Sequence, residues 1–81
     1  MANHNGIVRW DFRCDEKQRW TWIRKAAVGA LRSSVVARNL GAAMFDAMAY
    51  GFRPQQDRFL VDIGVIATHY APGKKPQILR P

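Results

Sequence analysis

The sequence predicts an α+β fold in which a three- or four-stranded antiparallel sheet packs on one α-helix. Residues 7–13 alternate between apolar and charged side chains, which is the period of a half-buried β-strand. Residues 57–67 form a largely apolar run that is typical of a central or covered strand. Residues 39–52, by contrast, place apolar side chains at helical spacing between an N-capping residue and a glycine. The chain has 81 residues, the length of one domain with a small core.

The first predicted strand, residues 7–13, has two faces of opposite character. One face carries Val8, Trp10 and Phe12, and the other carries Arg9, Asp11 and Arg13. A polar turn at residues 14–18 leads to a second strand at residues 19–26, in which Trp20, Trp22 and Arg24 share a face. The two strands together supply much of the aromatic material for a core.

Residues 16–32 also admit a helix, which would make the protein all-α. Asp15 followed by Gln18 imitates a capping box, and several apolar residues beyond them have helical spacing. Against a helix, Gly29 in its middle would cost about 1 kcal/mol relative to Ala. Trp20 and Trp22, spaced by two, also favour a strand. We favour the strand and keep the all-α fold as the alternative.

A short third strand is expected at residues 30–33, after a turn at Val28 and Gly29, and residues 34–38 then cross to the helix. Asn39 is a suitable N-cap, and Gly51 stands where a helix commonly ends in a left-handed residue. The expected core-facing side chains are those of Leu40, Ala43, Met44, Ala47 and Met48. Asp46 falls on the polar side of this helix and is expected to be solvated.

The last predicted strand, residues 57–67, completes a single domain of residues 1–67. Residues 68–81 contain three prolines, one glycine and three basic residues, Lys74, Lys75 and Arg80. This composition predicts a flexible basic C-terminal tail.

Residues 19–53 carry a pattern that resembles a group of small uncharacterised bacterial domains of the ββα type, whose function is unknown. The pattern is a W-x-W strand followed by a helix of the form A-x-x-D-A-x-x-x-G-[FY]. The matching positions are Trp20, Trp22, Gly29, Ser33, Ala43, Asp46, Ala47, Gly51 and Phe52. Ala37 departs from the pattern, where an aromatic residue is expected. The resemblance implies an antiparallel sheet packed on one helix and no particular activity.

Charge is the main functional signal in the composition. Thirteen Lys and Arg against six acids give a formal net charge of +7 and a pI near 10.6, which favours nucleic acid or an acidic protein as a partner. No apolar run approaches the roughly 20 residues of a membrane span. One cysteine cannot form an internal disulfide. We therefore expect a cytoplasmic protein that does not contact a membrane.

The residues typical of catalysis and metal binding are few. His4 and His69 lie in the expected tails, and Cys14 has acidic neighbours that disfavour its thiolate. A zinc site needs about four ligands, which these residues do not supply. No glycine-rich phosphate loop follows a strand. The sequence thus predicts a protein that is not an enzyme and has no metal or cofactor.

The candidate binding residues are basic and aromatic side chains that alternate in the predicted strands. Sheets that bind single-stranded nucleic acid stack bases on aromatic rings while Arg and Lys contact phosphates. The candidates are Arg9, Arg13, Arg19, Trp20, Trp22 and Arg24 in the strands, with Lys74, Lys75 and Arg80 in the tail. The simpler interpretation, which we favour for the tryptophans, is that they form the core against the helix. Phosphate contact then depends on the cations.

Phe45 suggests a second hypothesis. It lies about 140° from Leu40 around the helix, so that one helix face cannot bury both side chains. Phe45 is either covered by another segment or exposed as an anchor for a partner. The alternative function is therefore a protein-interaction module that acts as a homodimer, with the charge serving solubility.

Overall fold

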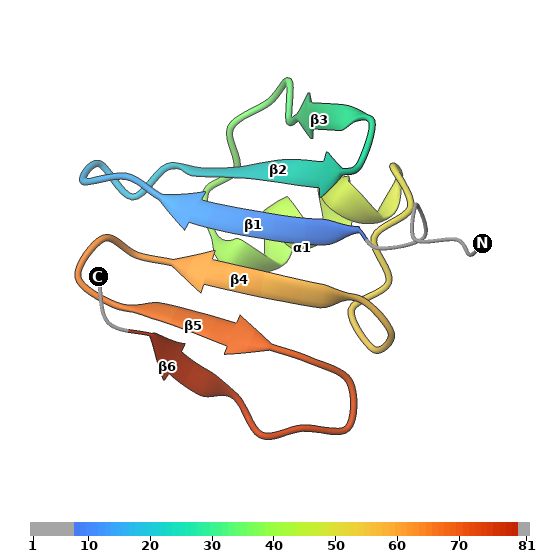
Figure 1. The fold of residues 1–81 in the computed structure, drawn as a ribbon. Helices are drawn as coiled ribbons and strands as arrows, with labels where there is room; N and C mark the ends of the chain where they lie inside the picture. Colours follow the sequence, from blue (N-terminus) through green and yellow to red (C-terminus); the bar gives the residue numbers. More distant parts are fainter. Residues whose placement is uncertain (1–7, 80–81) are drawn as a thin grey trace.

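The protein is described from a computed structural model, in which residues 8–79 form a six-stranded mixed sheet with one helix on one face (Figure 1). The elements are β1 (Arg9–Cys14), β2 (Trp20–Ala26), β3 (Gly29–Arg32), α1 (Leu40–Met48), β4 (Arg58–Asp62), β5 (Ala67–Tyr70) and β6 (Gln77–Leu79). The strand order is β3-β2-β1-β4-β5-β6. Neighbouring strands are antiparallel except β1 and β4, which are parallel.

The predicted antiparallel sheet of three or four strands was wrong in strand number and in direction. The chain leaves β3, passes through α1 and returns to the sheet beside β1, and a connection of this kind brings strands together in parallel. The all-α alternative was also wrong, because β2 pairs with both β1 and β3. Within the described residues, no helix has the length and apolar character needed to cross a bilayer.

The two unexpected strands come from the C-terminal part of the chain. Residues 57–67, predicted as one strand, divide at a hairpin turn in which the amide of Gly64 donates to Oδ1 of Asp62 at 2.8 Å. Gly64 has a φ of +96°, which glycine adopts without strain. Residues 67–70 and 77–79, which overlap the predicted flexible tail, pair with the sheet as β5 and β6. Residues 71–76 of that tail connect β5 to β6, and residues 80–81 lie outside the described residues.

The helix begins where the sequence predicts, but its regular part ends at Met48, before the predicted end at Gly51. Oδ1 of Asn39 accepts a hydrogen bond from the amide of Ala42 at 2.8 Å, so Asn39 is the N-cap. At the other end, the amide of Phe52 donates to the carbonyl oxygen of Ala47, and the amide of Gly51 donates to the carbonyl oxygen of Met48. Gly51 has a φ of +103°. These two bonds are those of a Schellman motif with glycine at its left-handed position.

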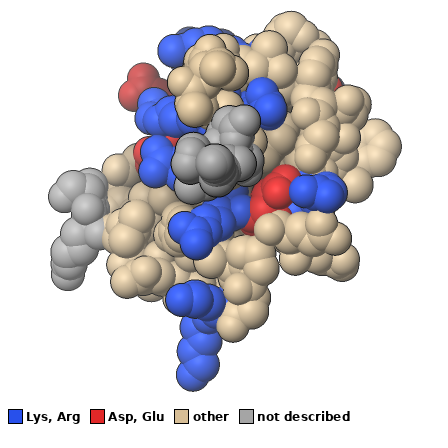
Figure 2. Space-filling view, turned by 45° about the vertical axis from the view of Figure 1, so that its right-hand side comes forward, with Lys and Arg blue, Asp and Glu red and all other residues tan. Residues whose placement is uncertain are grey.

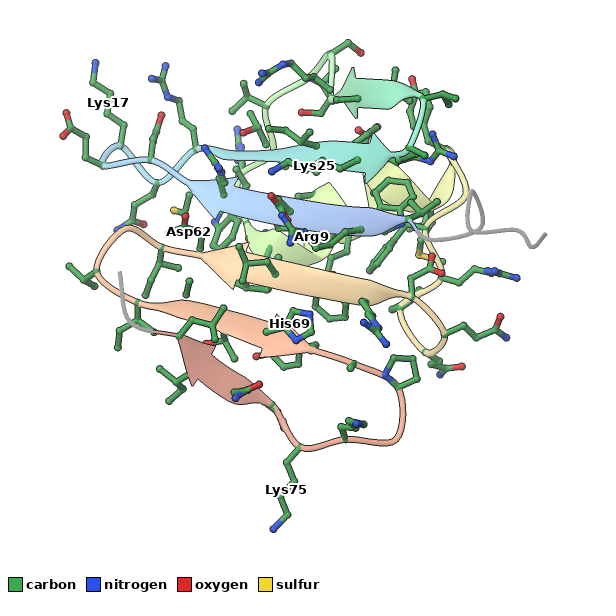
Figure 3. The ribbon with its side chains drawn as sticks, viewed as in Figure 1. Arg9, Lys17, Lys25, Asp62, His69 and Lys75 are labelled. Carbon is green, nitrogen blue, oxygen red and sulfur yellow. The ribbon has the colours of Figure 1, made fainter. Side chains whose placement is uncertain are left out.

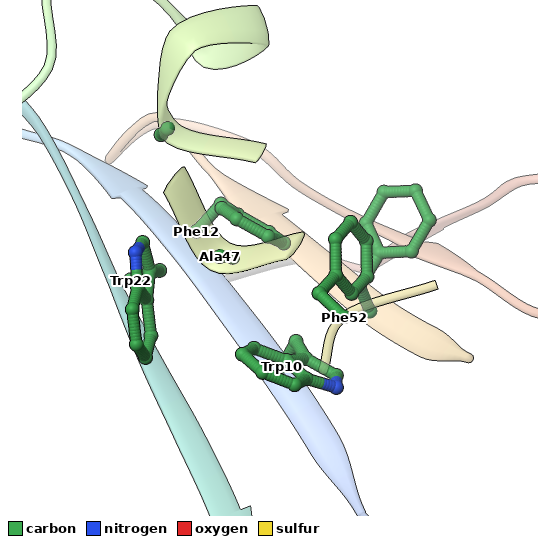
Figure 4. Close-up of a cluster of buried hydrophobic side chains, with 7 residues drawn as sticks. Trp10, Phe12, Trp22, Ala47 and Phe52 are labelled. Carbon is green, nitrogen blue, oxygen red and sulfur yellow. The ribbon is translucent and has the colours of Figure 1, made fainter. Parts of the chain in front are cut away.

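The core lies between α1 and the β2-β1-β4 half of the sheet, and aromatic rings fill it (Figure 4). The rings of Trp10 and Phe12 both contact Phe52, with centroids 5.2 and 5.0 Å apart. Ala43 and Ala47 face the sheet from α1, and their small side chains let the helix approach the rings closely. The buried members of the core are Trp10, Phe12, Trp22, Ala43, Ala47, Phe52 and Phe59.

Candidate functional site

The face of the sheet opposite α1 carries most of the sheet's charged side chains. Register places Arg9, Asp11 and Arg13 of β1 on this open face, because Trp10 and Phe12 point to the helix. The neighbouring strands add Arg32, Lys25, Arg58, Asp62 and His69 to the same face. Figure 3, which looks onto this face, shows Arg9, Lys25 and His69 in front of the sheet. No Trp, Phe or Tyr of the six described strands shares the face with them.

Three cations form a row at one end of this face. Arg9 of β1 is directly opposite Lys25 of β2 on one side and Arg58 of β4 on the other. Neighbouring strands are about 4.8 Å apart, so the row extends over roughly 10 Å. Like charges placed directly opposite each other destabilise a sheet. The repulsion within the row is offset only in part, by the carboxylate of Asp11, which lies between Arg9 and Lys25.

Two adjoining hollows extend this row toward the β5–β6 turn. One, of about 340 Å³, has Arg9, Lys25, Arg58 and His69 in its walls. The other, of about 460 Å³, shares Arg58 and His69 and adds Lys74 and Lys75. Among residues 8–79, no carboxylate lines either hollow. We call these six residues the basic surface: Arg9, Lys25, Arg58, His69, Lys74 and Lys75. In Figure 2, which brings this end of the sheet forward, blue Lys and Arg side chains cover more of the surface than red carboxylates.

Asp11 is the carboxylate nearest to the basic surface. Its side chain is 2% exposed, and Oδ2 lies 3.0 Å from Nζ of Lys25 while Oδ1 lies 3.4 Å from Nε of Arg9. One buried carboxylate thus holds two surface cations in place and neutralises one unit of their charge. Within residues 8–79, Arg58, Lys74 and Lys75 form no salt bridge.

The other predicted strand arginines lie away from the basic surface. Arg13 stands at the far end of the open face, in a hollow that it shares with Asp62. Arg19 pairs with Asp15 in the β1–β2 turn, with Nε 2.8 Å from Oδ2. The backbone amide of Arg19 also donates to Asp15 and, aided by the guanidinium, lowers the pKa of that carboxyl. Arg80 lies outside the described residues.

The predicted aromatic candidates are on the helix side of the sheet. Trp22 is buried, and its Nε1 donates to Oδ2 of Asp46 at 2.8 Å. Trp20 is half-buried and packs against the core. Arg24 shares this side, opposite Trp10. The tryptophans and the basic surface therefore occupy opposite faces, and the described strands offer no platform for stacking bases beside the cations.

Three members of the basic surface were missed by sequence reasoning. Lys25 lies on the same face of β2 as Thr21 and Ile23, and the tryptophans lie on the other face. The alternation of side chains along this strand could have identified Lys25 as a residue of the open face. Arg58 is the second residue of the last predicted strand, but nothing in the local sequence indicates that β4 lies beside Arg9. His69 was assigned to the tail, whereas it lies in β5.

Within the described part of the chain, no three His, Cys, Asp or Glu side chains are grouped as metal ligands would be. Comparisons with protein-family models, with curated proteins and with solved structures found no match. The resemblance to ββα-type domains stays a prediction from the residues alone.

Proposed function

We propose that the protein is a small non-catalytic module that binds nucleic acid by neutralising phosphates on the basic surface. The observation that carries this proposal is the row of Lys25, Arg9 and Arg58 across three adjacent strands. Asp11 neutralises one of the three charges in the row. A phosphate backbone, with its closely spaced negative charges, would relieve the repulsion that remains. Lys74 and Lys75 extend the same surface along the β5–β6 turn.

This binding would be insensitive to base sequence. Recognition of bases needs side chains that stack on them or reach their edges, and the open face has none of the tryptophans. Affinity would therefore come from release of counterions and fall steeply with salt. Single strands and duplexes would both bind.

The test compares two triple variants that remove equal charge. One is Arg58→Gln, Lys74→Gln and Lys75→Gln in the basic surface, and the control is Arg13→Gln, Lys17→Gln and Arg19→Gln at the other end of the sheet. Fluorescence anisotropy with a labelled duplex and a labelled single strand, between about 50 and 200 mM salt, measures affinity and its salt slope. We expect the first variant to lower the slope by roughly 2–3 and the control to lower it by less than 1.

Two results would contradict the proposal. Absence of binding by the unmodified protein at low salt would remove nucleic acid as the partner. Equal losses in the two variants would show that net charge, rather than the basic surface, determines binding.

A second candidate, self-association through α1, has its own supporting observation. The side chain of Phe45 is 76% exposed on the outer side of the helix. Met48 is also exposed, and the only charged residue of the helix, Asp46, is bonded to Trp22. Light scattering should then give twice the monomer mass, and Phe45→Asp should halve it without unfolding the protein. Val28, in the β2–β3 turn, is 96% exposed, and Val28→Asp is the control. A monomer at all concentrations would exclude self-association.

A further inference from the structure

His69 lies at the junction of the two hollows of the basic surface. It is half-buried in β5, on the open face of the sheet, and lies in front of the sheet in Figure 3. His69 and Arg58 are the residues that line both hollows, whereas each of the other four cations of the basic surface lines one. An anion that occupies either hollow is therefore in reach of the imidazole.

His69 is also the residue of the basic surface whose charge depends on pH near neutrality. The other five residues are Lys or Arg, which stay protonated between about pH 5 and 8. An imidazole side chain gains or loses its proton within that range. The charge of the basic surface can therefore change by one unit, and His69 is where it changes.

The groups that surround His69 on the side of the hollows are neutral or cationic. Leu60 of β4 and Gln77 of β6 are directly opposite it and carry no charge. Arg58 is its diagonal neighbour on β4, about 7–8 Å away. The β5–β6 turn contributes two lysines to one hollow, and β1 and β2 contribute one cation each to the other.

The carboxylate closest to His69 in the strand register is that of Asp62, its second diagonal neighbour on β4. Oδ1 of Asp62 accepts the amide of Gly64 at 2.8 Å, and Figure 3 shows Asp62 displaced from His69 toward the β4–β5 turn. Asp62 lines the hollow of Arg13 and neither hollow of His69. A protonated imidazole therefore meets no carboxylate among the described residues of the two hollows, and an anionic ligand would supply the opposite charge.

We propose that nucleic acid takes up one proton at His69 when it binds the basic surface, so that affinity rises as the pH falls from about 8 to 5.5. This inference rests on the function proposed above and adds a pH dependence to it. A phosphate beside the imidazole favours the charged form, and the charged form donates a charge-assisted hydrogen bond to the phosphate. Because such coupling is reciprocal, binding and protonation strengthen each other by the same factor.

The test measures affinity for the labelled duplex by fluorescence anisotropy at about pH 5.5 and about pH 8, each between about 50 and 200 mM salt. The unmodified protein should bind about 3- to 10-fold more tightly at the lower pH, which is the contribution expected of one charge pair near a protein surface. The salt slope should be steeper by about 0.9 at the lower pH, the value of one phosphate contact. His69→Gln should remove both differences. His4→Gln, at the other histidine of the chain, is the control and should retain them.

Proton NMR of the imidazole ring gives a second readout that does not depend on a folded His69→Gln variant. His4→Gln leaves His69 as the one histidine of the chain, which assigns its ring signals. These signals are followed between about pH 5 and 8 with and without saturating duplex. The midpoint of the His69 titration should lie at higher pH in the complex, because the bound phosphates favour the charged ring.

The outcomes separate this inference from the function on which it rests. Duplex binding that is equally tight at both pH values would overturn the inference and leave nucleic-acid binding standing. The same conclusion follows if His69→Gln keeps the pH dependence of the unmodified protein, or if the His69 midpoint is the same with and without duplex. Absence of binding at both pH values would overturn the proposed function and the inference together.

Discussion

Asp46 has a structural role that its place in the sequence does not suggest. It falls on the polar side of the helix, and the prediction of a solvated side chain was wrong, because its Oδ2 receives the indole N–H of Trp22. Helical spacing gives the direction of a side chain from its own axis. It does not show that a ring from β2, 24 positions earlier in the chain, ends within hydrogen-bonding distance. Asp11, buried beneath two cations, was missed as a structural residue for the same reason.

Replacing Asp46 by Ala should lower the free energy of unfolding by about 1–3 kcal/mol, because it leaves the N–H of the buried Trp22 without an acceptor. Asp46→Asn keeps an oxygen at the position and should lose less. Urea unfolding measures both, and the Trp22 indole proton should shift only slightly in Asp46→Asn. Glu16→Ala removes an exposed carboxylate from the β1–β2 turn and serves as the control. Equal stability of Asp46→Ala and Glu16→Ala would show that the bond contributes nothing.

At the scale of the element, α1 was predicted well and the C-terminal strands were not. The signals for the helix are local: Asn39 caps its first turn and Gly51 ends it, and both predictions are confirmed. The signals for β5 and β6 are not local, because strands of four and three residues carry too little alternation to be recognised. The apolar residues that follow Asp62 continue the pattern of a strand across what is in fact a turn.

The two glycines at the ends of α1 should respond to Ala in opposite directions. Gly51→Ala places a side chain at a φ of +103° and should destabilise the protein by about 1–3 kcal/mol. Gly41, inside the first turn, has a negative φ, and an added Cβ would meet only Oδ1 of Asn39 at 3.4 Å. Gly41→Ala should therefore stabilise the protein by about 0.5–1 kcal/mol. Thermal unfolding of the two variants checks this, and a shift of the same sign in both would contradict it.

Across the whole molecule, the core is confined to one half of a wide sheet. The nine-residue helix packs on β1 and β2, and every buried core residue belongs to β1, β2, β4, α1 or the residue Phe52. β3, β5 and β6 contribute no buried residue to it, and the side chain of Ile78 in β6 is 66% exposed. Tyr70 ties β5 to the core by stacking on Phe59, with ring centroids 4.7 Å apart. β3 and β6 are held mainly by backbone hydrogen bonds, which gives them little stability of their own.

Amide hydrogen exchange should therefore be graded across the sheet. Amides of β1 that pair with β2 and β4 should exchange only through global unfolding, while those of β6 should exchange through local opening at a small fraction of that free energy. Native-state exchange in low denaturant distinguishes these two routes. Equal protection of the β6 and β1 amides would contradict this expectation. It would show that contacts outside the core stabilise β6 as strongly as the core stabilises β1.

The basic surface was predictable in part. Arg9, Lys74 and Lys75 follow from the sequence, because a charged residue in an alternating strand and a lysine pair in a polar segment are exposed wherever the chain folds. Lys25, Arg58 and His69 become part of the same surface only through strand order. The structure brings the first two together with Arg9 in one row, although Arg9 and Arg58 are far apart in the chain.

The sequence by itself determined the features that depend on neighbouring residues: the start of the helix, the alternation of β1 and β2, the aromatic composition of the core and the excess positive charge. The tertiary structure alone decided that β1 and β4 are parallel neighbours, that the tryptophans and the basic surface lie on opposite faces, and that Arg58 and His69 line the same two hollows. The reason is physical: periodicity records which way a side chain points from its own strand, whereas the partner of a strand is selected by packing among segments that are distant along the chain.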